Sequence, residues 1–232
     1  MKKYIIYAAF LLVGVVGIAS IGAYLEPTDT PVALIKKVVQ DVTYKTKDMS
    51  DWAAAKVGVA LKDGEEVKTG MKSLALVLFT DGSGIMRVRE NSVLHIYGEK
   101  QDKNLNKNTF IEEGKINFEV SKQGEDEEFK FTTPTVVASI RGTEGLIFVT
   151  EGSTSFYLHR GEAFLQARLG SQQSGTISGN QSATIGASGS INIIQATQQQ
   201  MNDYTNSLQI ETRKLKVQTE SHELEIEYFP PE

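Results

Sequence analysis

One short stretch of the sequence, TPTVVASIRGTEG (residues 133–145), combines residue types that could do chemistry. Its apolar residues lead into Arg141, and Gly-Thr-Glu-Gly follows, so that a cation and the carboxylate of Glu144 flank a glycine turn. Such a pair has three interpretations: a buried structural clamp, a ligand contact, or a catalytic site. We favour the clamp, because the five N–H groups of a guanidinium can donate to carbonyls of adjacent turns.

A buried arginine also needs a partner, since half of a buried ion pair costs several kcal/mol. Glu144 and Asp81 are the candidate partners, and Gly142 with Gly145 would let the backbone turn closely around the guanidinium. The clamp interpretation predicts that Arg141→Ala lowers the free energy of unfolding by about 2 kcal/mol or more.

The remaining polar residues do not form a catalytic pattern. Catalysis requires placed acids, bases or nucleophiles, but His95, His159 and His222 are far apart and lack metal-binding spacing. Asp81-Gly82-Ser83-Gly84 resembles a calcium loop only at its start, because the later liganding acids are missing. We interpret it as a turn. The sequence therefore predicts no enzyme, no metal site and no cofactor.

Composition excludes further classes. The chain has 232 residues, a net charge of −5 and no cysteine. A nucleic-acid partner is not expected, because that function needs clustered Lys and Arg. Disulfides and thiolate chemistry are excluded.

The N-terminal segment predicts a membrane anchor. Lys2 and Lys3 precede an uncharged stretch from Tyr4 to Leu25, which is long enough to cross a bilayer as a helix. The two lysines predict that the N-terminus stays in the cytoplasm. A cleaved signal peptide is the alternative, but signal peptides have a shorter apolar core and small residues at the cleavage site. We favour an uncleaved anchor or signal over residues 1–25, followed by a linker over 26–31. The bulk of the chain would then lie outside the cytoplasm, on the inner membrane.

Residues 32–195 have the pattern of an all-β domain. The β-branched residues between Leu34 and Tyr44 favour a strand. Leu74–Phe79 is a short apolar run, and residues 85–97 alternate between apolar and polar types, as a half-buried strand does. Residues 98–109 are polar and predict a mobile loop. Residues 170–189 fit either a flexible linker or two short strands that close the sheet, and we favour the strands.

Residues 196–232 differ from the rest. From Ala196 to about Gln218 there is no Gly or Pro, and Met201, Tyr204, Leu208 and Leu215 fall on one helical face. This thin stripe predicts a helix that lies on the domain or pairs with a partner. A short acidic strand follows, in which Leu224, Ile226 and Tyr228 alternate with glutamates.

The order of these motifs resembles the FecR domain family, from about Val32 to Ile193. The first half of the resemblance is carried by LKDGEEVKTG (61–70), SLALVLFTDGS (73–83) and SVLHI (92–96). The second half is FKFTTP (129–134) followed by VASIRGT (137–143), the most distinctive string, and then Gly161-Glu162. Glu65 and Gly145 depart from the family pattern. The motif residues with a structural role are Thr133, Pro134, Arg141, Gly142, Thr143, Glu144, Asp81 and Gly82.

The resemblance implies an extracytoplasmic all-β domain, shaped as a jelly-roll-like sandwich or a short β-solenoid. It supplies no catalytic residue. The best-known members regulate iron-uptake sigma factors through a cytoplasmic region before the span, whereas only Met1-Lys2-Lys3 precede it here. We therefore expect a stand-alone, membrane-tethered member.

Three functions are compatible with this pattern. The first is a non-enzymatic binding or scaffold module for envelope partners, or for a second copy, that uses sheet edges, the loop from Gly98 to Asn108 and the C-terminal elements. The second is a single-span signalling component of the envelope. The third is a glycan-acting envelope enzyme, which would need a pair of carboxylates in one cleft.

Overall fold

The computed structural model describes residues 30–101, 104–122, 124, 128–209, 213–218 and 223–228. The predicted anchor Tyr4–Leu25 and most of the linker over 26–31 lie outside these residues, as does His222. Among the described residues, no helix combines the length and apolar character needed to cross a bilayer.

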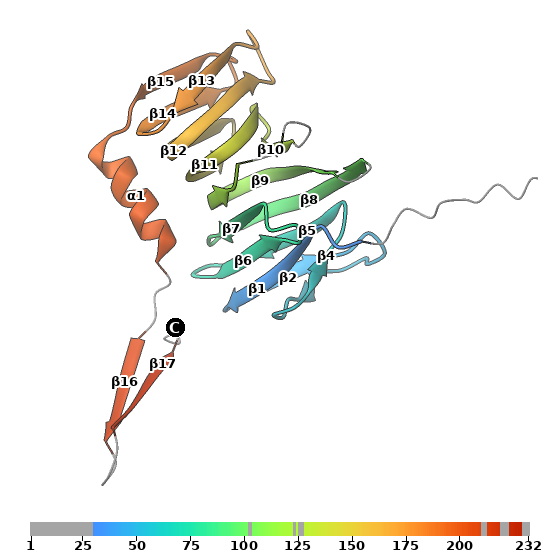
Figure 1. The fold of residues 1–232 in the computed structure, drawn as a ribbon, viewed down its shortest axis with the longest axis vertical. Helices are drawn as coiled ribbons and strands as arrows, with labels where there is room; N and C mark the ends of the chain where they lie inside the picture. The colour runs from blue at the N-terminus through green and yellow to red at the C-terminus, as the bar shows by residue number, and fades with distance from the viewer. Residues whose placement is uncertain are drawn as a thin grey trace, which may run out of the picture.

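The described chain is mostly β-structure with one short helix, which confirms the predicted all-β class (Figure 1). The first ten strands are β1 (Ala33–Val39), β2 (Val42–Lys45), β3 (Ala53–Ala54), β4 (Ala60–Leu61), β5 (Glu65–Thr69), β6 (Leu74–Phe79), β7 (Gly84–Val88), β8 (Ser92–Gln101), β9 (Asn104–Val120) and β10 (Phe129–Thr132). The remaining elements are β11 (Val136–Thr150), β12 (Ser153–Ala167), β13 (Ser174–Ser178), β14 (Gln181–Gly186), β15 (Ile191–Gln195), α1 (Gln198–Leu208), β16 (Arg213–Gln218) and β17 (Glu223–Tyr228).

Strands β1 to β15 form one sheet that bends into two layers. The first layer has the order β3-β2-β5-β8-β9-β10-β11-β12-β13, and the second has the order β4-β1-β6-β7-β9-β11-β12-β14-β15. Strands β9, β11 and β12 occur in both layers, because one half of each strand lies in the first layer and the other half lies in the second. All neighbours run antiparallel except β9 and β10. Of the two predicted shapes, this arrangement is closer to a sandwich than to a solenoid of parallel coils.

Each of the three shared strands turns at a glycine with positive φ. These glycines are Gly114 in β9 (φ 106°), Gly142 in β11 (φ 63°) and Gly161 in β12 (φ 89°). The pairing partners change beside each glycine: β9, for example, pairs with β8 up to Glu113 and with β7 from Ile116 onward. The left-handed conformation is available to glycine at little cost. The three glycines therefore form the corner between the layers.

The core lies between the two layers and is rich in phenylalanine. Phe79 of the second layer meets Phe129 of the first with ring centroids 4.9 Å apart, and Phe118 meets Phe131 at the same distance. All four side chains are fully buried. Aromatic contacts of this kind stabilise beyond their buried area, so these rings hold the layers together.

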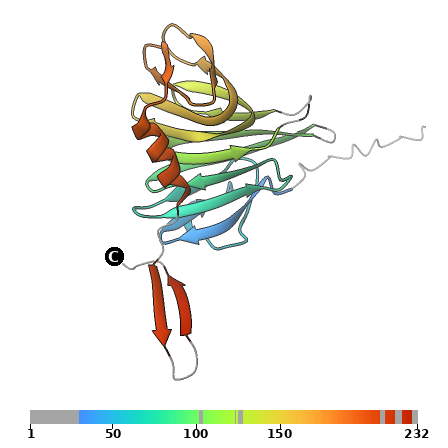
Figure 2. The ribbon, with the colours of Figure 1, turned by 60° about the vertical axis from the view of Figure 1, so that its left-hand side comes forward.

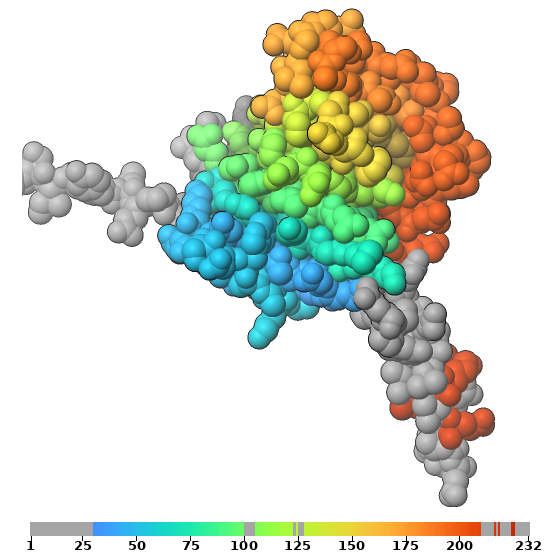
Figure 3. Space-filling model, turned by 180° about the vertical axis from the view of Figure 1, so that it is seen from behind, coloured from blue at the N-terminus to red at the C-terminus, as the bar shows by residue number. Residues whose placement is uncertain are grey.

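Seen from behind, β1 to β15 form one continuous body, with the N-terminal strands at one end and the C-terminal strands at the other (Figure 3). Helix α1 lies alongside the strands rather than between the layers (Figure 2).

The structure confirms several predicted strands. The apolar run Leu74–Phe79 is β6, the segment from Leu34 to Tyr44 contains β1 and β2, and residues 170–189 contain the pair β13 and β14. The acidic segment forms β17.

Three expectations from the sequence are wrong. Residues 85–97 form two strands, because the chain turns at Asn91, whose φ is 51°. Residues 98–109 are not a loop: Gly98 to Gln101 belong to β8 and pair with Asn104 to Lys107 of β9. The predicted helix that would reach Gln218 ends at Leu208, and Leu215 lies in β16, where pairing with β17 outweighs helical periodicity.

The corner predicts how two glycine substitutions should differ. A Cβ on Gly161 would lie 2.3 Å from the carbonyl oxygen of Gly142, whereas a Cβ on Gly152 (φ 73°) would meet no atom within 4 Å. Both alanines carry the left-handed penalty of about 1–2 kcal/mol, but only Gly161→Ala adds a collision, worth about 1–3 kcal/mol. Urea unfolding should show a larger loss for Gly161→Ala than for Gly152→Ala, and equal losses would contradict the tight corner.

Candidate functional site

The predicted clamp at Arg141 is wrong. Arg141 is exposed, and the two predicted partners are engaged elsewhere: Glu144 pairs with Arg160, and Asp81 pairs with Lys107. The reason is the two-residue period of β11, which buries Val136, Ala138 and Ile140 and turns the positions between them outward. Arg141 continues the outward series.

The Arg-Gly-Thr string is instead the β11 part of the corner. The buried Thr143 hydroxyl lies 2.9 Å from the carbonyl oxygen of Glu162 in β12 and 3.1 Å from that of Arg141. The N–H of Gly142 donates to the carbonyl of Ser121, just beyond β9. This motif therefore joins three strands where they change layer. Its role is architectural, as predicted, but Thr143 and Gly142 carry it rather than Arg141.

Thr133 and Pro134 form the turn between β10 and β11, and β11 begins at Val136. The buried Thr133 hydroxyl accepts the N–H groups of Thr135 and Val136 and lies 2.8 Å from the Thr154 hydroxyl. Arg168 donates from Nη1 to the Thr133 carbonyl at 2.6 Å. Arg168 thus makes the turn contact that the sequence interpretation assigned to Arg141. Arg168 comes directly after β12, whose residues alternate between buried and exposed, but its position in the sequence alone does not predict that it binds Thr133.

Asp81 and Gly82 form the predicted turn between β6 and β7, and Asp81 also holds a buried cation. The Asp81 carboxylate accepts the Ser83 N–H at 2.9 Å and the Lys107 ammonium at 2.5 Å. The Lys107 side chain is fully buried, with Nζ 6.0 Å from the centre of the Phe129 ring. Burial would raise the pKa of Asp81, but hydrogen bonds from Lys107 and Ser83 hold it below its ordinary value. Sequence reasoning missed Lys107 because it lies in the segment interpreted as a loop.

Helix α1 packs on the outer face of the second layer. Thr197 caps its start in a reciprocal arrangement with Gln200. Tyr204 is buried against Leu146 of β11 and Tyr157 of β12, and its ring stacks on His159 at 4.9 Å. Burial, with Glu144 nearby, raises the pKa of Tyr204 to about 12. The predicted stripe residues Met201 and Tyr204 contact this face, while Leu208 is 37% exposed.

Polar contacts hold the C-terminal half of α1. The amide of Asn117, in the second-layer half of β9, donates to the buried Ser207 hydroxyl at 3.1 Å and accepts from Arg87. Arg89 donates from Nη1 to the carbonyl of Gln209, the residue after the helix, at 2.7 Å. These bonds fix where the chain leaves the domain.

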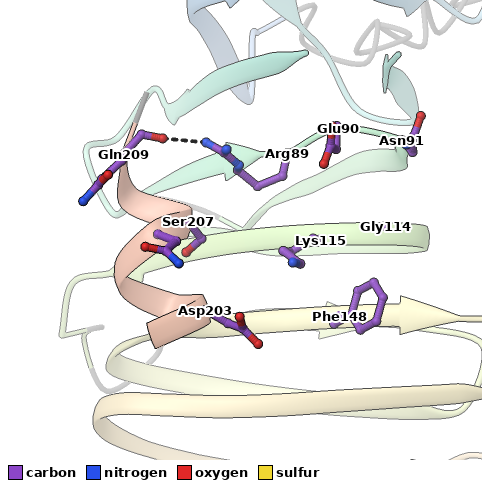
Figure 4. Close-up of a pocket in the computed structure, with 10 residues that line it drawn as sticks. Arg89, Glu90, Asn91, Gly114, Lys115, Phe148, Asp203, Ser207 and Gln209 are labelled. Carbon is purple, nitrogen blue, oxygen red and sulfur yellow. Dashed lines mark hydrogen bonds between the residues drawn. The ribbon is translucent and has the colours of Figure 1, made fainter. Parts of the chain in front are cut away.

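A cavity of about 660 Å³ lies between this half of α1 and the sheet (Figure 4). We call it the helix cavity. Its walls come from the β7–β8 turn, from β9, from β11 and from α1, and its lining includes Arg89, Glu90, Lys115, Phe148, Asp203 and Asn206. Phe148 is 44% exposed, and the Lys115 ammonium lies 5.5 Å from its ring centre.

The helix cavity offers both donors and acceptors. Arg89 is engaged with Gln209, and Asp203 accepts a hydrogen bond from Gln199. Within the described part of the chain, the side-chain amides of Asn91 and Asn206 and the ammonium of Lys115 make no hydrogen bond. No group of three His, Cys, Asp or Glu among the described residues could hold a metal ion. The cavity suits a polar ligand that can both donate and accept and that places one apolar group on Phe148.

Fold and corner together define a two-layered, all-β domain with a C-terminal helix docked on one outer face. Residues 65–163 match the sequence model of the family described as FecR protein, so this part of the chain is similar to a FecR domain. The Arg-Gly-Thr corner lies inside the matched range, and α1 lies outside it.

Solved structures agree on the fold. Two crystal structures of a protein described as a "putative anti-sigma factor", from Parabacteroides distasonis ATCC 8503, superpose with a TM-score of 0.51 at 13% identity. The match covers 60% of this chain and 64% or 63% of the other, which is less than two thirds of its length. At this identity the likeness establishes the fold alone. No curated protein matches the chain.

The buried pair predicts a contrast between two aspartates. Asp81→Ala leaves the Lys107 ammonium buried without its carboxylate and should lower the free energy of unfolding by about 2 kcal/mol or more. Asp63 pairs with Lys47 at 2.8 Å, but both side chains are at least half exposed, so Asp63→Ala should cost less than about 1 kcal/mol. Arg141→Ala, at an exposed position, should change stability by less than about 0.5 kcal/mol. Urea unfolding measures all three variants. A smaller loss of unfolding free energy for Asp81→Ala than for Arg141→Ala would support the buried-clamp interpretation of Arg141 instead.

The lowered pKa of Asp81 predicts how stability depends on pH. The contribution of the ionised carboxylate is complete above the unfolded-state pKa of about 3.9 and is lost as pH falls through the lower folded-state pKa. Wild type should therefore exceed Asp81→Asn by a constant margin between about pH 5 and 7, and the margin should shrink below about pH 4. Unfolding at a series of pH values tests this, and a margin that stays constant to pH 2.5 would contradict it.

Proposed function

We propose that this chain is a membrane-tethered, extracytoplasmic binding module that docks protein partners in envelope signalling without catalysing a reaction. The helix cavity is the observation that carries the proposal. It joins residues from the FecR domain to residues of α1, so its shape depends on both.

The chemistry of the helix cavity supports a peptide segment as its occupant. A peptide backbone presents an N–H donor and a C=O acceptor at every residue, and Asn91 and Asn206 offer amides that can bond to both. Lys115 and Asp203 supply one charge of each sign, and Phe148 supplies an exposed apolar surface. Aromatic residues are enriched at protein interfaces for this reason.

The comparisons support a signalling context. Residues 65–163 match the FecR family model, and the fold is similar to that of a protein described as a "putative anti-sigma factor". The location is inferred from the sequence: Tyr4–Leu25 is the proposed single span in the inner membrane, with the N-terminus inside and the domain outside.

The proposal has a variant in which the span itself transmits a signal to another membrane protein, which the FecR match also favours. Replacing Tyr4–Leu25 with an unrelated apolar helix separates the two. A binding module keeps its function after the exchange, whereas a signalling span loses it.

The helix cavity is tested in the full chain in its native membrane. A photo-crosslinking amino acid at the exposed Asn206 should form an adduct with a protein other than a second 25.5 kDa copy. Phe148→Ser should reduce this adduct at least fivefold. Phe164→Ser is the matched control, because Phe164 is equally exposed (47%) but lies outside the cavity. An adduct that survives Phe148→Ser, or that Phe164→Ser reduces equally, would contradict the proposed docking site.

A further inference from the structure

A second cavity lies on the outer face of the first layer, on the side of the sandwich opposite to α1. It has a volume of about 440 Å³, and we call it the sheet groove. Strands β8, β9 and β10 lie side by side beneath it (Figure 1). Ile96, Lys107 and Phe129 of these strands are buried in the core, so the residues that alternate with them face outward. The sheet groove and the helix cavity therefore share no wall.

Two cross-strand rows form the floor of the sheet groove. In the first row, Tyr97 of β8 lies opposite Asn108 of β9, and Asn108 lies opposite Lys130 of β10. In the second row, Glu99 of β8 lies opposite Asn106 of β9. All five residues line the cavity. The floor thus offers one aromatic ring, two amides and one charge of each sign.

Tyr97 gives the sheet groove an apolar surface. Its side chain is 38% exposed, and its ring is parallel to that of His95, with 5° between the planes and 6.4 Å between the centroids. His95, Tyr97 and Glu99 share the outer face of β8, because they alternate along the strand. One face of the Tyr97 ring is therefore turned to His95, and the other is turned to Glu99 and the groove. A flat ring exposed in this way can pack on the C–H groups of a ligand.

The two floor amides are held in position by the protein. Asn108 accepts the Thr132 hydroxyl on Oδ1 at 2.9 Å, and within the described part of the chain its Nδ2 group donates no hydrogen bond. Asn106 accepts the N–H of Glu128 on Oδ1 at 3.1 Å. The Nδ2 group of an amide carries two N–H donors. Since Asn108 is already oriented, it can donate to a ligand with little further loss of side-chain freedom.

The charges around the sheet groove favour a neutral ligand. Asp63 pairs with Lys47 at 2.8 Å, and Glu128 pairs with Lys130 at 2.6 Å. These two carboxylates and Glu99 line the cavity and would repel an anion. A polycation gains little, because two of the three carboxylates already have a cation. Paired carboxylates still accept hydrogen bonds, since each has about four lone-pair sites, so a ligand with hydroxyl groups suits the groove.

The backbone of the floor is already paired. Lys107 and Asn108 pair with β8 on one side and with β10 on the other, and the N–H of Gly98 donates to Asp63 at 3.2 Å. A peptide that adds to a sheet bonds to the free backbone groups of an edge strand, and the floor offers no such edge. The described side chains also contain no group of three that could hold a metal ion. The ligand of the sheet groove is therefore recognised through side chains and carries hydroxyls.

We propose that the sheet groove binds a neutral oligosaccharide through its pyranose rings. A pyranose has a face of C–H groups and a rim of hydroxyls that both donate and accept. The C–H face packs on Tyr97, one hydroxyl accepts from Nδ2 of Asn108, and neighbouring hydroxyls donate to the carboxylates of Glu99 and Asp63. This site goes beyond the proposed protein docking, and it lies on the other outer face from the helix cavity, so either proposal can fail alone.

Saturation-transfer NMR on the full chain, in a detergent without sugar groups, tests the site. Chitohexaose, cellohexaose and maltohexaose are the probes, because they are neutral pyranose chains that differ in linkage and substituents. At least one probe should bind, and Tyr97→Ala should weaken that binding at least tenfold. Phe164→Ala is the matched control and should leave it unchanged, since Phe164 is exposed on the outer face of the same layer but outside the groove. No binding of any probe at millimolar concentration, or equal binding by the two variants, overturns the proposal.

A second variant separates recognition from folding. Asn108→Asp keeps the size of the side chain and an oxygen for the Thr132 hydroxyl, but it removes both N–H donors. It should weaken the bound probe at least fivefold and unfold at the wild-type temperature. Unchanged affinity in Asn108→Asp contradicts the assigned contact. Trilysine is the charged probe: if it binds, Glu99→Gln abolishes its binding and no oligosaccharide binds, the groove takes a cationic ligand and the proposal is wrong.

Discussion

The corner at which three long strands change layer is the constraint on which the rest of the structure depends. Strands β9, β11 and β12 each contribute one half to each layer, and each turns at a glycine with positive φ. Thr143 bonds across this corner to the β12 backbone, and Gly161 lies so close to the Gly142 carbonyl that a side chain has no room. Because the same strands build both layers, one layer cannot open without bending the other. The most distinctive string of the family, Arg-Gly-Thr, is thus explained by backbone geometry and not by the chemistry of its arginine.

The candidate functional features are arranged around this corner. The second-layer halves of β9, β11 and β12 present Asn117, Leu146 and Tyr157 to α1, which fixes the helix across the outer face. Two contacts hold α1 against the sheet beside the helix cavity. Tyr204 packs on the rings of Tyr157 and His159, and Arg89 donates to the carbonyl of Gln209 just after the helix. The sandwich therefore positions a helix and a cavity that lie outside its core.

Strands whose residues alternate in hydrophobicity could be predicted from the sequence, whereas strands and buried residues that depend on contacts with distant residues could not. Alternation and glycine turns located β6, β13, β14 and β17, and the motif order identified the FecR family. The same alternation could have shown that Arg141 faces solvent, had it been applied through the strand. The hairpin of β8 and β9 was missed because its strands are held together by backbone pairing and their polar residues show no hydrophobic alternation. The burial of Lys107 depends on its ion pair with Asp81, 26 residues away, which local sequence cannot reveal. Likewise, the helical periodicity of residues 213–218 is overridden by their pairing with β17.

Native-state hydrogen exchange tests the central claim most directly, because it reports the opening free energy of each strand separately. The informative amides are those of β11 on either side of its corner: Val136 to Ile140 in the first layer, and Gly145 to Thr150 in the second. If the shared strands make the two layers one cooperative unit, the slowest amides of both halves should exchange with the same free energy, equal to that of global unfolding. If one half exchanges through an opening several kcal/mol smaller than the other, the layers unfold independently and the corner does not unite them.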